Sequence, residues 1–299
     1  MISPNSNQIV AIISNKMSFQ ISFLTVVLCA CVINVNSQII KVATFNIRTD
    51  LKGDGVNQWK YRKKVMSKFV RKEKFDIICM QEVINNQLLD ILQCDKRFDY
   101  IGVGRDDGQE KGEYVPIIYR KDKYVLVRGG TFWLSQTPNR VGEIGWDANY
   151  PRIATWAIFR ISKTGKEIFI INTHLDNVGK LARQNGMKLI LDTIPVLSDN
   201  NNVIFTGDFN SIENSAVYHA MMNNPLMLKD VCKHCLKAYG VNYTFHRFGK
   251  IEEGARTRID YMFVSKNIMP LVVNIPKPKS DKGVFISDHN PIIAKLKME

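Results

Sequence analysis

The chain has 299 residues, of which 45% are hydrophobic, and a formal net charge of +13. This length and composition allow one large domain or two small ones with an ample core, and the absence of internal repeats or low-complexity tracts excludes repeat and fibrous architectures. The positive charge favours polyanionic partners such as nucleic acid, phosphoinositides or an anionic membrane face, with an ordinary basic soluble protein as the alternative.

The N-terminal 37 residues have the features of a signal peptide. A single lysine precedes the run Ile21–Val35, which at about 15 residues is too short for a comfortable transmembrane span. Small residues then allow cleavage before Gln38, so we expect residues 1–37 to be removed and the protein to be secreted. An uncleaved anchor and a start at Met17 remain alternatives. In a secreted chain the sequon Asn242–Thr244 is a candidate glycosylation site.

Four cysteines follow the predicted cleavage site. Cys79 lies in an apolar run and is expected as a buried thiol, while Cys94 closes a helical stretch. Cys232 and Cys235 flank His234 in a segment that offers only three zinc ligands, too few for a structural site. In an oxidising compartment a Cys232–Cys235 disulfide is therefore the preferred interpretation.

The first half of the chain alternates strands and helices. Residues 39–45 predict a strand that ends at Asn46, and residues 58–74 predict an amphipathic helix. Residues 76–80 predict a buried strand that ends at Glu82, and a short helix follows it. This alternation is typical of α/β layering. Further strands are expected at 100–104, 115–119, 130–135, 155–161 and 167–172, with loops at 105–113 and 136–151.

The second half continues the pattern. A helix at about 178–194 should stop near Pro195. Val203–Phe205 then predict a buried strand, after which Gly207 is expected to let the backbone turn sharply and to place Asp208 and Asn210 on a loop. The remaining predicted elements are a helical patch near 214–223, a strand at 258–264 that contains Asp260, and a final strand at 292–296. No linker divides the chain, so residues 38–299 are predicted to form a single domain.

Apolar strands in this chain repeatedly end in side chains that can bind a metal ion or a phosphate. Strand ends are where α/β proteins place their functional sites. Polar residues are common in the turns that follow strands, but five such strand ends in one chain are more than turns alone explain. They indicate one shared site. The residues concerned are Asn46, Glu82, His174, Asp208 with Asn210, and Asp288 with His289.

These blocks resemble the endonuclease/exonuclease/phosphatase superfamily, which contains deoxyribonuclease I, and they occur in the family order. The blocks are Thr-Phe-Asn-Ile at 44–47, Gln-Glu-Val at 81–83, Asn-Thr-His-Leu at 172–175, Gly-Asp-Phe-Asn-Ser at 207–211, Arg-Ile-Asp-Tyr at 258–261 and Ser-Asp-His-Asn-Pro at 287–291. The resemblance implies a deoxyribonuclease I-like α/β (α+β) fold, a four-layer sandwich of two packed mixed sheets flanked by helices, and a Mg²⁺-dependent hydrolase. The chain looks most like small secreted members with Gly-Arg-Asp-Asp-Gly and Gly-Thr-Phe-Trp-Leu-Ser blocks.

Metal and base roles can be assigned to five of these residues. Glu82 is the expected principal ligand of Mg²⁺, with Asn46 and Asp288 assisting, and Mn²⁺ or Ca²⁺ are alternative ions. His289 is the candidate general base or phosphate-contacting imidazole. Asp260 would orient its ring, because a His–Asp pair raises the basicity of the imidazole and fixes its tautomer.

The remaining residues would position the attacking water and bind the phosphate. Asp208 would align or deprotonate the attacking water, and Asn210 would hold a phosphate oxygen. His174 would contact the scissile phosphate or the leaving group. Glu113 matches the family's acidic partner of this histidine, with an ordinary loop salt bridge as the alternative. Arg152 resembles the family's phosphate-contacting arginine, with a surface ion pair as the alternative.

The leading hypothesis is a secreted, Mg²⁺-dependent phosphodiesterase, most simply a nuclease-like monomer without stable membrane insertion. The first alternative is a phosphoinositide or inositol phosphate phosphatase, or a sphingomyelinase, with the same site. The second is a non-catalytic polyanion-binding protein. Packing is preferred to base stacking for Trp133, Trp146 and Trp156. A solvated helix face is preferred to a DNA track for the basic residues Arg62, Lys63, Lys64, Lys68, Arg71 and Lys72.

Overall fold

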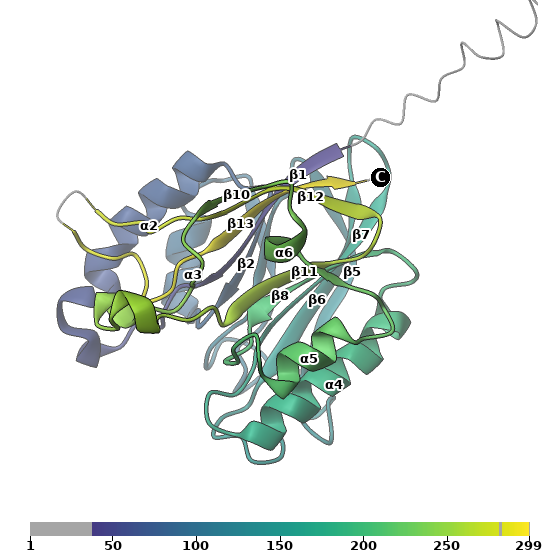
Figure 1. The fold of residues 1–299 in the computed structure, drawn as a ribbon, viewed down its shortest axis with the longest axis horizontal. Coiled ribbons are helices and arrows are strands. Elements are labelled where there is room, and N and C mark those ends of the chain that lie inside the picture. The colour runs from purple at the N-terminus through teal and green to yellow at the C-terminus, as the bar shows by residue number, and fades with distance from the viewer. Residues whose placement is uncertain (1–37, 281–282, 299) are drawn as a thin grey trace, which may run out of the picture. The chain divides into compact units, whose positions relative to one another are not determined.

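The computed structural model describes residues 38–280 and 283–298, so the predicted signal peptide lies outside the described residues. Residues 37–299 cluster as one compact unit, built on two mixed β-sheets (Figure 1). The seven-stranded sheet has the order β10-β12-β13-β1-β2-β4-β3 and the six-stranded sheet the order β5-β6-β7-β8-β11-β9. Parallel pairing of β1 with β2 and of β7 with β8 makes both sheets mixed.

The strands and helices have the following bounds. The first sheet contains β1 (Gln38–Asn46), β2 (Ile77–Gln81), β3 (Phe98–Ile101), β4 (Ile117–Arg120), β10 (Lys237–Gly240), β12 (Ile268–Ile275) and β13 (Ile292–Met298). The second contains β5 (Tyr124–Trp133), β6 (Ile153–Ile161), β7 (Glu167–His174), β8 (Asn202–Asp208), β9 (Lys229–Asp230) and β11 (Asp260–Val264). The helices are α2 (Trp59–Glu73), α3 (Asn85–Leu92), α4 (Lys180–Leu197), α5 (Ala216–Met222) and α6 (Val231–His234), with 3₁₀ turns η1 (Lys52–Asn57), η2 (Arg247–Gly249) and η3 (Glu253–Ala255).

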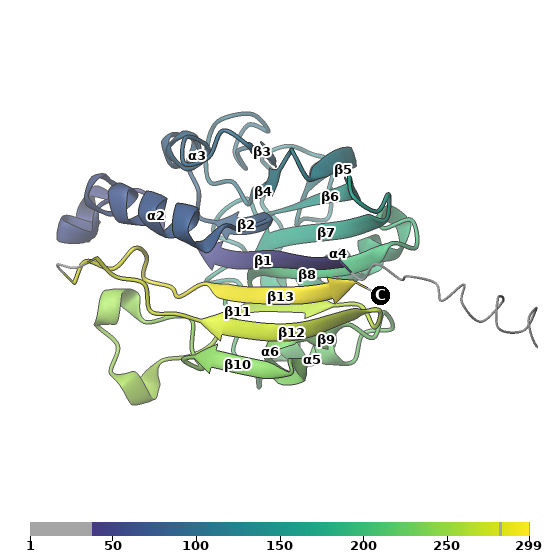
Figure 2. The same cartoon turned by 90° about the horizontal axis from the view of Figure 1, so that it is seen from above.

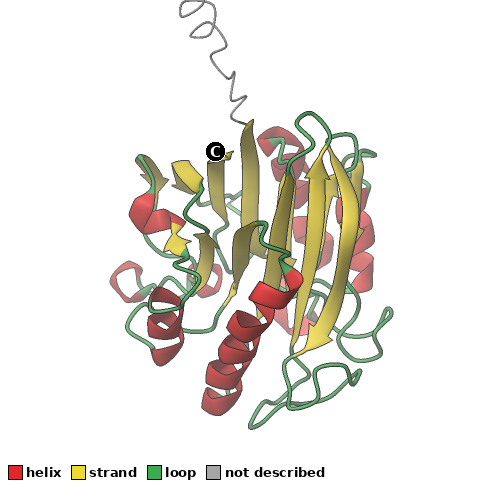
Figure 3. Cartoon of the chain, turned by 90° about the vertical axis from the view of Figure 1, so that its right-hand side faces the viewer, coloured by secondary structure: helices red, strands yellow, loops and turns green. Residues whose placement is uncertain are grey.

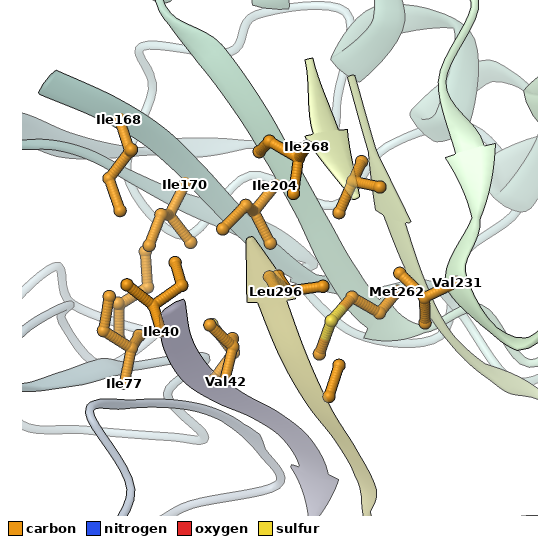
Figure 4. Packing of buried hydrophobic residues seen from close by; sticks show 14 of the residues in the cluster. Ile40, Val42, Ile77, Ile168, Ile170, Ile204, Val231, Met262, Ile268 and Leu296 are labelled. Carbon is orange, nitrogen blue, oxygen red and sulfur yellow. The ribbon is translucent and has the colours of Figure 1, made fainter. Parts of the chain in front are cut away.

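Three large apolar clusters hold the four layers together. Val42 points between the sheets while Ala43 points to the outer face, because successive side chains in a strand alternate. Figure 4 shows the inner cluster, where Ile40, Ile170 and Leu296 of the two sheets meet. The other two clusters seat α2 and α3 on the first sheet and α4 and α5 on the second. Helices therefore cover the outer faces of the sandwich (Figure 3), which confirms the predicted fold class.

Several element boundaries differ from the sequence prediction. Helix α4 continues through Pro195 to Leu197 instead of stopping near the proline. Pro195 lies in the last turn, where its missing N–H costs one hydrogen bond, and the preceding Ile194 is fully buried in the core. Strand β12 was not predicted, and its Pro270 lies at a shift in register, where a proline is tolerated. Asp260 begins β11 and is not an interior strand residue.

The turn after β8 has a different cause from the one expected. Gly207 is a strand residue, and Asp208 is the last residue of the same strand. A Cβ atom on Gly207 would lie 2.4 Å from the carbonyl oxygen of Thr173, so glycine is needed for the close approach of β7. The chain turns at Asn210, whose φ is 45°.

The expected Cys232–Cys235 disulfide is not formed. Both residues are free thiols, as are Cys79 and Cys94. The Cys235 thiol lies 3.9 Å from the carbonyl oxygen of Cys232. Cys232 is partly buried, and this burial raises the pKa of its thiol to about 12. In the short helix α6 the Cys232 thiol therefore packs against the core and does not bond to Cys235.

Candidate active site

The candidate site lies where the carboxyl ends of four strands meet. In the first sheet the pairing of β1 with β2 sets Asn46 beside Gln81, and Glu82 follows. In the second sheet the pairing of β7 with β8 sets His174 beside Asp208. Eight of the ten residues predicted for the site line one cavity of about 630 Å³: Glu82, Glu113, Arg152, His174, Asp208, Asn210, Asp288 and His289.

The other two predicted residues, Asn46 and Asp260, support this lining from behind. The Asn46 amide nitrogen donates to Glu82 Oε1 and to Asp208 Oδ2, both at 2.9 Å. The Asn46 side-chain oxygen accepts from the backbone N–H of Arg48 at 3.0 Å. In this arrangement Asn46 holds two carboxylates in position and turns its nitrogen, not its oxygen, toward them.

Asp208 is the residue on which the site converges. Its Oδ2 atom lies 3.6 Å from His174 Nε2 and 3.8 Å from His289 Nε2. Its Oδ1 atom accepts the backbone N–H of Asn210 at 2.9 Å, a contact that the left-handed turn at Asn210 provides. Burial and then the nearby charge of Asp260 raise the pKa of Asp208 to about 7. A carboxylate with such a pKa can accept a proton near neutral pH.

His289 is held as a cation. Its Nδ1 atom lies 2.8 Å from Asp260 Oδ2, which fixes the ring so that Nε2 faces Asp208 and the cavity. Burial would lower the pKa of His289, but the carboxylates of Asp260 and Asp208 outweigh burial and raise it to about 10. The backbone N–H of Asp260 is in turn held by the Thr244 hydroxyl at 3.1 Å.

His174 has the opposite charge state. Burial, followed by the positive charges of Arg152 and Arg105, lowers the pKa of His174 well below its ordinary value, so the ring is neutral. Its Nε2 atom lies 3.0 Å from the Asn210 amide nitrogen and its Nδ1 atom 3.3 Å from Arg152 Nη1. Glu113 is 3.9 Å from His174 Nδ1, beyond hydrogen-bond distance, and binds Arg105 at 2.7 Å instead.

The donor set fits a hard divalent cation. Glu82, His174 and Asp208 each offer an atom within 4.8 Å of the others. Burial and then the charge of Glu82 raise the pKa of Glu113, and Glu82 also contributes to raising that of Asp288, so negative charge is crowded here and a cation would relieve it. Carboxylate oxygens are the ligands that Mg²⁺ and Mn²⁺ prefer. Arg48 supplies partial compensation, 3.8 Å from Glu82 and 3.9 Å from Asp288.

Sequence reasoning placed Arg62 on a solvated helix face, and the structure contradicts this. The Arg62 side chain is fully buried. Its guanidinium donates to backbone carbonyls of the described chain, among them Ile47 at 2.7 Å, Ile286 at 2.8 Å and Arg48 at 3.0 Å. A sequence signal existed, because position 62 shares the apolar stripe of the helix with the buried residues Trp59, Met66 and Val70.

The rim of the cavity also carries residues that the sequence did not single out. Arg247 and Phe248 both adopt left-handed backbone conformations, with φ of 49° and 54°. On another part of the lining, the half-exposed Tyr150 ring lies over the guanidiniums of Arg105 and Arg152, at 5.0 and 5.9 Å. These residues offer aromatic and cationic contacts to a substrate.

The three tryptophans considered as stacking platforms have other positions. All three lie in the described part of the chain, and none lines the cavity. Trp133 is buried and donates to the Arg105 carbonyl at 2.7 Å, and Trp156 stacks on Phe169. Packing is the role that the structure supports for these two.

The fold and the cluster at the strand ends define a hydrolase of phosphate esters. The chain belongs to the Endonuclease/Exonuclease/phosphatase family, whose family model matches residues 34–289. No helix among the described residues has the length and hydropathy needed to cross a membrane.

Solved structures of similar proteins cover almost the whole described chain. The endonuclease/exonuclease/phosphatase from Bacteroides vulgatus is 41% identical, with a TM-score of 0.84 over 88% of this chain and 100% of the other. A mannosyl-6-phosphatase from Bacteroides thetaiotaomicron VPI-5482 is 34% identical, with a TM-score of 0.79 over 86% and 99% of the two chains.

Among curated proteins, a probable CCR4-Not complex 3'-5'-exoribonuclease subunit Ccr4 from Vairimorpha ceranae is 24% identical over 285 residues. The match covers 80% of this chain and 58% of the relative, so this chain spans little more than half of that protein's length.

Proposed function

We propose that this protein is a secreted, divalent-metal-dependent phosphodiesterase that hydrolyses nucleic acid, with Mg²⁺ as its ion and a monomer as its working form. One observation carries the proposal: Asp208 Oδ2 lies 3.6 Å from His174 Nε2 and 3.8 Å from His289 Nε2, so a carboxylate and two imidazoles face one point of the cavity. A proton acceptor, a fixed positive charge and a neutral hydrogen-bonding ring around one point are what hydrolysis of a phosphate ester requires.

The charge states suggest a division of roles. Asp208 would take the proton from the attacking water. His289, already protonated near neutral pH, is a poor base, and it would instead stabilise negative charge on the phosphoryl oxygens. Neutral His174 and the Asn210 amide would bind a phosphate oxygen or the leaving group from the other side of Asp208, with Arg152 behind His174.

The metal would act at the crowded carboxylates. Glu82 and Asp288 would hold it beside Asp208, and when bound it would neutralise charge on the phosphate that otherwise repels the incoming water. Asn46 would fix the orientation of Glu82 and Asp208 through its two hydrogen bonds. This chain's own residues therefore provide the charge neutralisation and positioning on which phosphoryl transfer depends.

The relatives support two substrate classes. The exoribonuclease name of the Vairimorpha ceranae relative supports nucleic acid, as does the net charge of +13. The mannosyl-6-phosphatase from Bacteroides thetaiotaomicron supports a sugar phosphate as the second candidate. The half-exposed Tyr150 ring in the cavity favours this second candidate, because a sugar ring can pack on an aromatic face.

A substrate panel tests the proposal. The purified protein is incubated with single-stranded oligonucleotide, plasmid DNA, mannose 6-phosphate, sphingomyelin and a soluble phosphoinositide, each with Mg²⁺ and with EDTA. We expect Mg²⁺-dependent cleavage of the nucleic acids, lost in Asp208→Ala. Preferred turnover of the lipid or inositol substrates would favour a phospholipase-like or inositol phosphatase activity. No turnover of any substrate would favour a polyanion-binding protein.

Secretion needs its own test. We propose that residues 1–37 direct export and are removed. N-terminal sequencing of the protein from the medium of expressing cells should begin at Gln38. Retention of the protein in cell membranes with an intact N-terminus would instead indicate an anchor.

A further inference from the structure

A second cavity lies outside the active site, between helix α2 and the described part of the connection from β12 to β13, residues 276–280 and 283–291. Its volume is about 520 Å³. Figures 1 and 2 show this described part running alongside α2, although the two are about 200 residues apart in sequence. Five exposed lysines line it, three from the helix and two from the connection: Lys64, Lys68, Lys72, Lys277 and Lys279. We refer to it as the lysine groove.

The positive charge of the lysine groove is largely uncompensated. Lys64, Lys68 and Lys72 form no ion pair with any residue in the described ranges. The one carboxylate of the described lining, Glu73, is already bound at 2.7 Å by Lys41. Only Lys277 has an acidic neighbour in the described part, and Glu253 is 3.6 Å from it and largely exposed. Clustered like charges repel one another, so an anionic ligand bound in this concave surface would be stabilised by them.

The shape of the lysine groove suits a linear polyanion. Lys64, Lys68 and Lys72 repeat every four residues, which at 1.5 Å rise per residue spaces them by about 6 Å along one helix face. This spacing is comparable to that of successive phosphates along a nucleic acid strand. Between the lysines the lining is apolar, with Phe69 and Pro278 among its residues. A positively charged groove that follows the backbone is a feature of surfaces that bind single strands.

The lysine groove is connected to the active site through one short segment. Ile286 lines the groove, and Asp288, two residues later, lines the active-site cavity. Arg62 of α2 ties this segment to the strand end at Ile47. The row of lysines begins at Lys64, in the first half of α2. The 3₁₀ turn η1, which precedes α2, contributes Gly53 and Asp54 to the lining of the active-site cavity. The lysine groove and the active-site cavity are therefore lined by neighbouring segments of the chain.

We propose that the lysine groove binds single-stranded nucleic acid through its phosphates and thereby raises the affinity of the enzyme for polymeric substrates. Which bond is cleaved rests on the proposed function, whereas binding of nucleic acid in the lysine groove does not depend on it. Six basic residues were predicted to form a solvated face of this helix. Arg62 is buried, Lys64, Lys68 and Lys72 form the proposed phosphate-binding row, and Lys63 and Arg71 are exposed outside the lysine groove.

The test compares two variants with equal loss of charge. Lys64, Lys68 and Lys72 are changed to glutamine together in one variant. Lys121, Lys163 and Lys266, which are exposed and lie outside the lysine groove, are changed to glutamine in the control. Binding of fluorescein-labelled oligo(dT) to each full-length protein is measured by anisotropy in EDTA, where cleavage does not interfere, between 50 and 200 mM salt.

We expect the groove variant to bind about tenfold more weakly and the slope of log K against log salt to fall by about 2, since each lost phosphate contact removes about 0.7. The control should change by less than about twofold. Hydrolysis of the small substrate bis(4-nitrophenyl) phosphate should be unchanged in both.

Two results overturn the proposal. One is equal loss of oligonucleotide affinity in the groove and control variants, which would reduce the effect to net charge. The other is groove-dependent binding of phosphatidylserine vesicles without binding of oligo(dT), which would indicate a membrane surface. If the wild-type protein cleaves no substrate but binds oligo(dT) through the lysine groove, the proposed function is wrong and the proposal that the groove binds nucleic acid is supported.

Discussion

The Arg62 guanidinium donates to the Ile286 carbonyl oxygen at 2.8 Å, although 224 residues separate the two in sequence. The same Nη1 atom donates to the Ile47 carbonyl at 2.7 Å. Arg62 thus joins the segment that follows Asn46 to the segment that precedes Asp288. Burial lowers the pKa of Arg62 to about 10, yet the side chain remains a cation at neutral pH. It holds both sides of the expected metal site with one side chain.

Changing Arg62 to methionine should therefore affect both folding and the site. Two buried carbonyls and two partly buried ones would lose their donor, and we expect a loss of about 3–5 kcal/mol in the free energy of unfolding. Urea denaturation measures this loss. Lys63→Met, at the adjacent exposed position, should change stability by less than about 0.5 kcal/mol. Similar stability in the two variants would show that Arg62 does not hold the segments of Ile47 and Ile286 together.

The Asp260–His289 pair predicts a specific change in titration. In Asp260→Asn the imidazole loses the carboxylate that raises its pKa, so the pKa of His289 should fall from about 10 toward or below its ordinary value. NMR titration of the His289 ring measures this. The turnover number should fall by about 10²–10⁴-fold at pH 8, where the variant's ring would be neutral. An unchanged pKa would contradict the assignment of His289 as a fixed cation.

Gly207 offers a test of the packing that positions Asp208. In Gly207→Ala the new methyl would lie 2.4 Å from the Thr173 carbonyl oxygen, so β7 and β8 must separate. We expect a loss of about 1–3 kcal/mol in stability and a large loss of activity. Gly254→Ala is the matched control, because a Cβ there meets no atom within 4 Å among the described residues. Thermal unfolding of both variants distinguishes steric conflict from a general effect of replacing glycine.

His246 predicts how stability depends on pH. Burial, followed by the positive charges of His289 and Arg256, lowers the pKa of His246 to about 4 in the folded protein. The unfolded chain binds this proton near pH 6.5, so between pH 6.5 and 4 the unfolded state holds more protons and stability falls as pH falls. In His246→Gln this part of the pH dependence should disappear. Urea unfolding of both proteins at pH 7, 6 and 5 measures the difference.

Much of the fold could be predicted because apolar strands and amphipathic helices are local patterns. Residues such as Glu82, His174 and Asp208 could be singled out because each follows an apolar strand. Arg62 could not be placed correctly by charge alone, since its partners are carbonyls of distant segments. The role predicted for Gly207 is wrong for the same reason: glycine is needed there because the backbone of Thr173, in another strand, lies close to it.

The charge states of the two site histidines also needed three-dimensional information. The sequence predicts both His174 and His289 at strand ends. The structure confirms this for His174, which ends β7, whereas His289 lies in the loop that precedes β13. Burial lowers the pKa of both rings. The charge of Arg152 adds to burial at His174, whereas the carboxylate of Asp260 helps to outweigh it at His289, so the two pKa values move in opposite directions. Such differences depend on contacts between elements, which no local pattern contains.

The most direct test of the account is the turnover of bis(4-nitrophenyl) phosphate by Asp208→Asn in Mg²⁺. The variant keeps the size of the side chain but cannot accept a proton, and Asp199→Asn, outside the cavity, serves as its control. We predict that the turnover number falls by about 10³-fold or more in Asp208→Asn and by less than twofold in the control. Activity within about tenfold of wild type in Asp208→Asn would contradict the claim that the site is organised around this carboxylate.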